Sequence, residues 1–224
     1  MIRILAVGTF LLAMGIAPAA DPKLTVKVEE QEPPKDLSDA VRALLDNKAM
    51  SVFDDAKLLC TVWACKSLES KATAEEAKAG LKYANLEETT VVGAAKFPEQ
   101  WIDYRKQKIK PGVYTLRLGL QPMDGDHQGT APFNDFLLLS PADKDKKPEV
   151  VEAKEMHELS AKSVGRKHPG IMLLFPNKKP TDAPAVEAKP KEHWTLNFQI
   201  PVTAAGEKAN LGFSLVVVGV TMAE

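Results

Sequence analysis

The sequence predicts a mainly β protein, an antiparallel β-sandwich of the immunoglobulin-like or jelly-roll-like kind with a few short peripheral helices. Short apolar runs rich in β-branched residues recur along the chain, and Pro, Gly and Asp turns separate them. Alternation such as Tyr114, Leu116 and Leu118 is typical of a strand with one buried face. The regular strand–helix alternation of an α/β protein is absent.

The first twenty residues are typical of a secretory signal peptide. Arg3 supplies a positive charge, residues 4–17 are apolar, and Ala17 to Ala20 offer small residues for cleavage. The apolar run is shorter than the roughly 20 residues that a membrane-spanning helix needs. We therefore predict an exported protein, periplasmic or extracellular, with no membrane insertion after signal cleavage.

The charge composition gives no sign of a nucleic-acid partner. The chain has 29 Lys and Arg residues and 30 Asp and Glu residues. It therefore lacks the excess of basic side chains that is typical of proteins that bind nucleic acids. Envelope proteins or a small ligand are the partners that remain open.

A single domain is expected over residues 37–224, after a leader or linker at 21–36 that is charged and contains two adjacent prolines. The leader is expected to be extended, or to form a short strand before a break. In the domain the pattern predicts helices at 37–46 and 152–163 and a third helix capped by Thr73 and Glu76. It predicts a hairpin around residues 54–57 and strands at 86–97, 113–120, 135–140, 170–175, 193–200 and 211–220. The segment at 142–149 is expected to be a charged surface loop, and 176–192 an exposed Pro- and Lys-rich loop.

Cys60 and Cys65 are expected to be two separate thiols in or near the core. They lie five residues apart in a strand-like run, and five residues of extended strand span roughly 16 Å. A disulfide needs Cα atoms within about 7 Å, so a bridge would require a turn between them. A C-x4-C pattern without a second cysteine pair is also a poor zinc signal.

One polar loop offers spacing that fits a calcium site. Against the twelve-residue calcium loop, Asp124, Asp126, Gln128 and Asp135 occupy positions one, three, five and twelve, and Gly129 occupies position six. Calcium prefers six to eight oxygen ligands, which alternate residues of a tight loop can supply. Gln128 is neutral and a weak calcium ligand, and the side chain of Asp135 is short for the bidentate ligand at position twelve. A plain turn, in which Asp and Gly are common, is therefore the alternative.

His127 in the same loop supports two further hypotheses. A zinc or copper site would join it to His168 or His193, although the sequence shows no spaced ligand pair. A hydrolase-like periplasmic enzyme would use Asp126 and His127 as its acid–base pair. No nucleophile elbow, phosphate-binding loop or dinucleotide fingerprint accompanies them. His127 and His168 also remain candidate ligand-binding residues without a metal.

A second polar group surrounds Arg117. Its side chain is expected on the non-core face of its strand, where it could form a structural or solvated salt bridge with Asp103 or Asp135, since exposed ion pairs are common and individually weak. The alternative is a sugar- or carboxylate-binding face made from Trp101, Tyr104 and Arg117.

The stretch from Asp103 to Asp145 resembles an uncharacterised family of secreted bacterial proteins. It carries a D-Y-R-x-Q-x-I-K-P-G-V-Y-T-L-R core, a D-G-D-H loop and a D-F-L-L-L-x-P-A strand. The similarity extends to the segment at His168 and to the C-terminal strand. The resemblance implies one exported domain and carries no particular activity.

These observations favour a non-catalytic binding or structural domain of the bacterial cell envelope, with a calcium-type loop as a hypothesis. One alternative is the periplasmic enzyme described above. The other is an envelope scaffold protein that pairs through an exposed strand edge.

The calcium hypothesis predicts a calcium-dependent melting temperature. A weak extracellular-type site filled at about 10 mM calcium would stabilise the fold by roughly 1.4–2.7 kcal/mol. Thermal melts with calcium and with a chelator should then differ by several degrees, and the Asp126→Asn variant should lose the difference. Identical melts would leave the plain turn as the interpretation.

Overall fold

The computed structural model describes residues 23–121, 131–178 and 180–221. Two β-sheets pack face to face over one core, which confirms the mainly β, sandwich-type fold class. The larger sheet is antiparallel throughout. Its order follows β1 (Leu24–Glu30), β2 (Leu45–Asp54), β3 (Lys57–Cys65), β5 (Val91–Phe97), β8 (Gly112–Leu120), β9 (Asp135–Pro141) and β10 (Ile171–Leu173).

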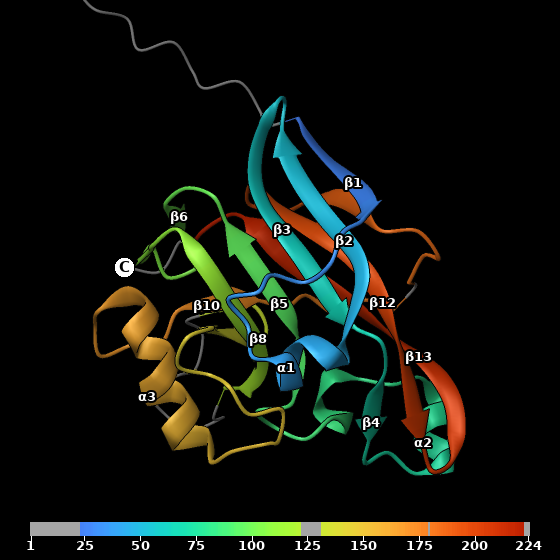
Figure 1. Cartoon of the computed structure of the whole chain (residues 1–224). Coiled ribbons are helices and arrows are strands. Elements are labelled where there is room, and N and C mark those ends of the chain that lie inside the picture. Colours follow the sequence, from blue (N-terminus) through green and yellow to red (C-terminus); the bar gives the residue numbers. More distant parts are fainter. Residues whose placement is uncertain (1–22, 122–130, 179, 222–224) are drawn as a thin grey trace, which may run out of the picture.

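The smaller sheet lies behind the larger one in Figure 1, where its long strands are orange and red. It contains β11 (Ala185–Lys189), β12 (His193–Ala204) and β13 (Glu207–Val218) in that order, and β4 (Leu68–Ser70) pairs in parallel with the end of β12. A short hairpin of β6 (Trp101–Ile102) and β7 (Lys108–Ile109) stands apart from both.

The strands of the larger sheet follow one another in chain order. This is a meander, whereas immunoglobulin and jelly-roll domains use Greek-key connections. The sheets also join at one edge. Beyond β10, Leu174 bridges to Leu215, and the Phe175 N–H donates to the Ser214 carbonyl at 2.8 Å. The chain after β10 therefore runs alongside β13.

Three α-helices lie on the periphery of the described part of the chain. α1 (Asp39–Leu44) begins after Ser38, whose hydroxyl accepts from the Val41 N–H at 3.3 Å. α2 (Ala74–Ala79) begins with the predicted capping box of Thr73 and Glu76 but ends after six residues. α3 (Ala153–Val164) agrees with the helix predicted at 152–163 and ends at Gly165, which is in the left-handed conformation.

Two segments, one expected as a leader that is extended or forms a short strand and the other as an exposed loop, supply edge strands to the sheets. β1 lies within the leader or linker expected at 21–36, and it pairs with β2 along its whole length. β11 lies within the exposed loop expected at 176–192 and pairs with the start of β12. Both are charged strands at the edges of their sheets. Backbone hydrogen bonds hold them there with little apolar burial, and their charges discourage pairing with strands of other chains.

The core fills the space between the sheets. Trp63, Leu116, Leu139 and Phe213 are among its fully buried side chains. A second apolar cluster lies on the outer face of the larger sheet, where Met156 of α3 packs with residues of β9 and β10. The larger sheet is therefore covered on both faces at this end. For that reason β8 is buried on both faces and not half-buried as its alternation predicted.

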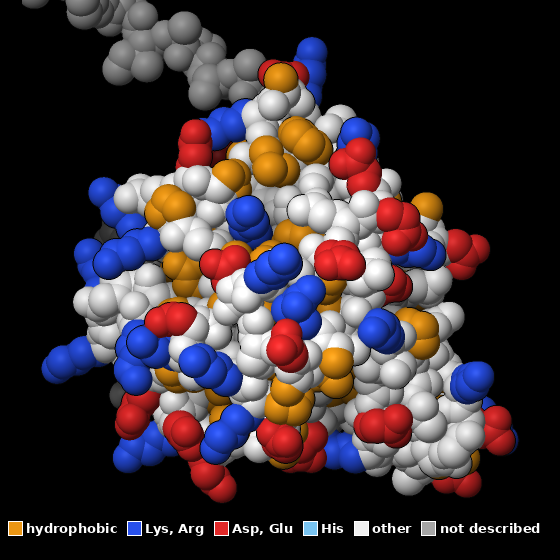
Figure 2. Space-filling view, viewed as in Figure 1, with side chains coloured by type: hydrophobic (Ala, Val, Ile, Leu, Met, Phe, Trp, Pro, Cys, Tyr) orange, Lys and Arg blue, Asp and Glu red, His pale blue; other side chains and the backbone are white. Residues whose placement is uncertain are grey.

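No helix within 23–121, 131–178 or 180–221 is long and apolar enough to cross a membrane. The predicted signal peptide at 1–20 lies outside the described residues. On the face of the molecule seen in Figure 2, basic and acidic side chains are interspersed.

Cys60 and Cys65 are free, separate and buried, which confirms the expectation for both thiols. Both lie on β3. The Cys65 thiol donates to the Val91 carbonyl at 3.2 Å. Burial raises the pKa of each thiol to about 12, so thiolate is scarce at neutral pH.

Both thiols should therefore be inert to Ellman's reagent in the folded protein at pH 8, and both should react once guanidinium unfolds the chain. An Ala56→Cys variant, in the exposed turn between β2 and β3, is the control and should react at once in the folded state. Rapid native reaction of the unaltered protein would contradict the buried placement.

Candidate functional site

The guanidinium of Arg117 is a fully buried charge, and its counter-charge on Asp145 is buried beside it. Arg117 is 0% exposed and Asp145 is 4% exposed. The Arg117 Nε–H donates to Asp145 Oδ2 at 2.7 Å, and Nη2–H donates to Oδ1 at 2.9 Å. The pair is thus bidentate, the strongest geometry for a buried ion pair.

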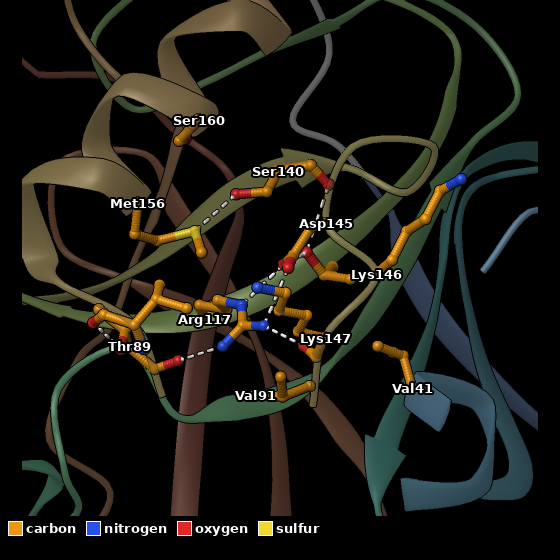
Figure 3. A network of polar contacts seen from close by, with 12 residues as sticks. Val41, Thr89, Val91, Arg117, Ser140, Asp145, Lys146, Lys147, Met156 and Ser160 are labelled. Atoms are coloured by element: carbon orange, nitrogen blue, oxygen red, sulfur yellow. Dashed lines mark hydrogen bonds and ion pairs between the residues drawn. The ribbon is translucent and has the colours of Figure 1, made fainter. Parts of the chain in front are cut away.

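Backbone carbonyls accept the remaining guanidinium protons, as Figure 3 shows in part. Nη1 donates to the carbonyls of Thr89 at 2.8 Å and Glu149 at 2.9 Å, and Nη2 also donates to the carbonyl of Lys147. A guanidinium has five N–H donors, so all are used. No donor remains for a ligand.

Arg117 therefore forms the expected salt bridge, but neither Asp103 nor Asp135 is its partner, and its enclosed guanidinium does not fit the alternative role in a ligand-binding face. Its partner is Asp145, from the loop at 142–149 that was expected to be surface. The strand does turn Arg117 away from the inter-sheet core. However, α3 and the loop cover that face, so the guanidinium is enclosed.

Polar side chains around the ion pair tie the covering segments to the sheet. Thr115 donates its hydroxyl to Asp145 Oδ2. Thr89 uses its hydroxyl twice with Val151, donating to the carbonyl at 2.7 Å and accepting from the N–H at 2.9 Å. On α3, the Ser160 hydroxyl lies 2.8 Å from the Leu139 carbonyl. The cluster is structural, because each group satisfies another buried group.

Asp103 also has a structural role. Its carboxylate is fully buried and accepts from the N–H groups of Gln107, Arg105 and Ile171 at 2.7, 3.0 and 3.2 Å, and from Gln107 Nε2 at 3.0 Å. Burial raises the pKa of Asp103, and these donors oppose the rise. The bond to Ile171 attaches the β6–β7 hairpin to β10.

The proposed face of Trp101, Tyr104 and Arg117 does not form. Trp101 stacks on Phe97 with ring centroids 4.9 Å apart, and its Nε1–H donates to the Val217 carbonyl at 3.0 Å. Tyr104 is buried against the ring of His193, 5.6 Å away. Each side chain is held by a different part of the fold.

The histidine candidates are also separated. His168 is exposed in the turn after α3, whereas His193 is buried with Nδ1 2.8 Å from the Pro190 carbonyl oxygen. His127 lies outside the described residues. Within the described part of the chain, no group of three or more His, Cys, Asp or Glu side chains is arranged to hold a metal ion.

The calcium-loop residues Asp124, Asp126 and Gln128 likewise lie outside the described residues, so the calcium hypothesis stays a prediction. The same holds for the enzyme hypothesis built on Asp126 and His127. Asp135 is described. It is the first residue of β9, pairs with Leu120 of β8 and is half-buried.

Asp135 lines a cavity of about 490 Å³ that the sequence analysis did not find. The cavity lies where the end of α2 and the 3-10 helix η1 (Tyr83–Asn85) face β13 and the chain after β10. The remaining lining residues are 79–83, 176–178, Pro180 and 210–212. They come from segments far apart in sequence, and no motif marks them.

Buried contacts fix the shape of this cavity. The Tyr83 hydroxyl donates to the Phe175 carbonyl at 2.8 Å and accepts from the Ser214 N–H at 3.1 Å. A Cβ added to Gly212 would lie 2.8 Å from Pro180 and 2.9 Å from Asn177. Only glycine allows the segment after β10 to pass so close to β13. The walls are therefore largely preformed.

The cavity wall carries one half-buried carboxylate and two exposed cationic side chains. Burial raises the pKa of Asp135. The pKa of Tyr83 is raised first by its own burial and further by the neighbouring charge of Asp135. Lys82 and Lys178 line the same space from exposed positions. No hydrogen bond from a described residue reaches the Asp135 carboxylate.

No family model, curated protein or solved structure matches this chain. The resemblance of residues 103–145 to a family of secreted bacterial proteins therefore stays a prediction, and the functional argument rests on the geometry.

The buried ion pair gives a stability prediction. Asp145→Ala should destabilise the protein by about 3–5 kcal/mol, because it leaves the Arg117 charge buried without a counter-charge. Denaturant unfolding measures the loss. Asp143→Ala is the matched control, since Asp143 is exposed in the same loop and pairs only with Lys144.

The double variant Arg117→Met/Asp145→Leu removes both charges and should be more stable than Asp145→Ala alone. Equal stability of Asp145→Ala and Asp143→Ala would show that the ion pair is not buried in solution.

Proposed function

We propose that this protein is an exported, non-catalytic binding domain that holds a small molecule in the cavity beside Asp135. The single observation that carries the proposal is the cavity itself, a preformed space of about 490 Å³ with a half-buried carboxylate in its wall. Ligand sites in proteins are commonly of about 300–1,000 Å³, mostly apolar, with a few placed polar groups.

The composition of the lining supports binding. Ala79, Leu81, Pro176, Pro180 and Leu211 supply apolar surface. The polar groups come from separate walls, an arrangement that orients a ligand; they belong to Lys82, Tyr83, Asp135, Asn177, Lys178 and Asn210. The Asn177 side chain is held by donating to the Phe213 carbonyl at 3.0 Å, which leaves its own carbonyl oxygen as an acceptor.

The described lining offers Asp135, Tyr83 and two lysines as ionisable groups but no nucleophile paired with an imidazole, and this composition supports binding more than hydrolysis. Among the described lining residues, no Ser, Thr, Cys or His side chain is present to serve as a nucleophile or imidazole base. The export of the domain is the part of the proposal that rests on the N-terminal sequence alone.

A cavity-filling variant tests the proposal. Small molecules from a broad library that raise the melting temperature of the protein should lose that effect with Ala79→Trp, because the indole occupies the space they need. Ala84→Trp is the matched control, since Ala84 is exposed on the neighbouring η1 and does not line the cavity.

Ligand-induced shifts of amide NMR signals at Tyr83 and Leu211 provide the second measurement. The proposal fails if no molecule shifts these signals, or if every stabilising molecule binds Ala79→Trp and Ala84→Trp equally well.

A further inference from the structure

We propose that the cavity selects organic cations, molecules that carry an ammonium or guanidinium group on an apolar body, and that Asp135 is the residue that recognises the charge. This inference rests on the proposed function and names the ligand class of the same site.

Asp135 is held in position by the sheet. As the first residue of β9 its backbone is held on both sides, by pairing with Leu120 and by accepting from the Leu174 N–H at 3.0 Å. A short side chain on a paired strand has little freedom to move. The carboxylate is therefore a fixed group in the cavity wall, as a recognition element should be.

The surroundings of the Asp135 carboxylate are unfavourable for its charge. Burial removes water from the carboxylate and raises its pKa, and no described residue donates a hydrogen bond to it. Asp103 shows the alternative in the same protein, since four N–H groups satisfy that buried carboxylate. A ligand cation would supply to Asp135 the counter-charge and donors that the fold does not.

Two lysines of the wall carry the opposite charge. Lys82 and Lys178 could attract an anion, but both are exposed. Long lysine side chains keep their ammonium groups in water while the stems cover apolar surface. Asp135 cannot move out of the cavity in this way. The lysine charges stay hydrated, whereas the Asp135 carboxylate is held in the wall and is partly desolvated. Asp135 therefore determines which ligand charge the cavity selects.

Apolar side chains also line the cavity. Leu81 and Leu211 both line the cavity, one from the segment before η1 and one from β13, and the prolines after β10 add further apolar surface. A purely polar cation would leave this surface in contact with water. An apolar body attached to the charged group covers it.

The experiment uses matched probes that differ only in the head group. Phenyl, cyclohexyl and butyl compounds would each be titrated with an ammonium, a hydroxyl or a carboxylate head, by NMR and by calorimetry. The ammonium member of at least one series should bind at least tenfold more tightly than its hydroxyl partner, and the carboxylate member should bind most weakly.

Asp135→Asn should abolish the preference for ammonium over hydroxyl while the hydroxyl compound binds as before. Asp182→Asn is the matched control, because Asp182 is exposed and does not line the cavity. Ammonium affinity should rise as the pH rises through the raised pKa of Asp135, since only the ionised carboxylate attracts the cation. The other ionisable groups of the described walls are Tyr83, Lys82 and Lys178, and burial raises the pKa of Tyr83 further above the range of a carboxyl group.

Three results would overturn the inference. The carboxylate members could bind most tightly, the ammonium preference could survive in Asp135→Asn, or no ammonium member could bind more tightly than its hydroxyl partner. Each of these leaves the proposed function standing if other molecules still distinguish Ala79→Trp from Ala84→Trp. Failure of that comparison is a failure of the proposed function.

Discussion

The buried guanidinium of Arg117 is the interaction on which the covering of the larger sheet depends. An isolated charge in a protein interior is strongly unfavourable, so each of its donors needs an acceptor. Asp145 and the carbonyls of Thr89, Lys147 and Glu149 supply these acceptors. The loop before α3 is therefore held against β8, and it leads the chain directly into the helix that covers β9.

This covering determines where a ligand could enter. The outer face of β8 and β9 is closed by α3 and the Arg117 cluster, and the inner face is closed by the smaller sheet. The cavity lies instead at the junction of the two sheets, where the chain after β10 runs beside β13. Gly212 permits that close approach, and Tyr83 connects its hydroxyl to both segments. The candidate site is a consequence of how the sheets join.

Elements with strong local patterns could be predicted from the sequence. The capping box at Thr73 and the glycine at Gly165 act within one helical turn, so the residues that set each helix end are neighbours in the chain. The candidate site could not be predicted in this way. The sequence identified Asp135 as a candidate ligand, but as part of the calcium-type loop and not of a cavity. Its cavity neighbours Tyr83 and Leu211 lie far away in sequence and carry ordinary core patterns.

The sequence by itself determined the fold class, most strands and helix ends, and the separation of Cys60 and Cys65, because periodicity, turn chemistry and strand geometry are local. Only the tertiary structure decided which charges are buried and which groups meet. Arg117 has the alternating position of an exposed side chain, and nothing in the chain marks Asp145 or three backbone carbonyls as its partners. Burial and electrostatic pairing depend on what covers a strand face, and that is set by packing between distant segments.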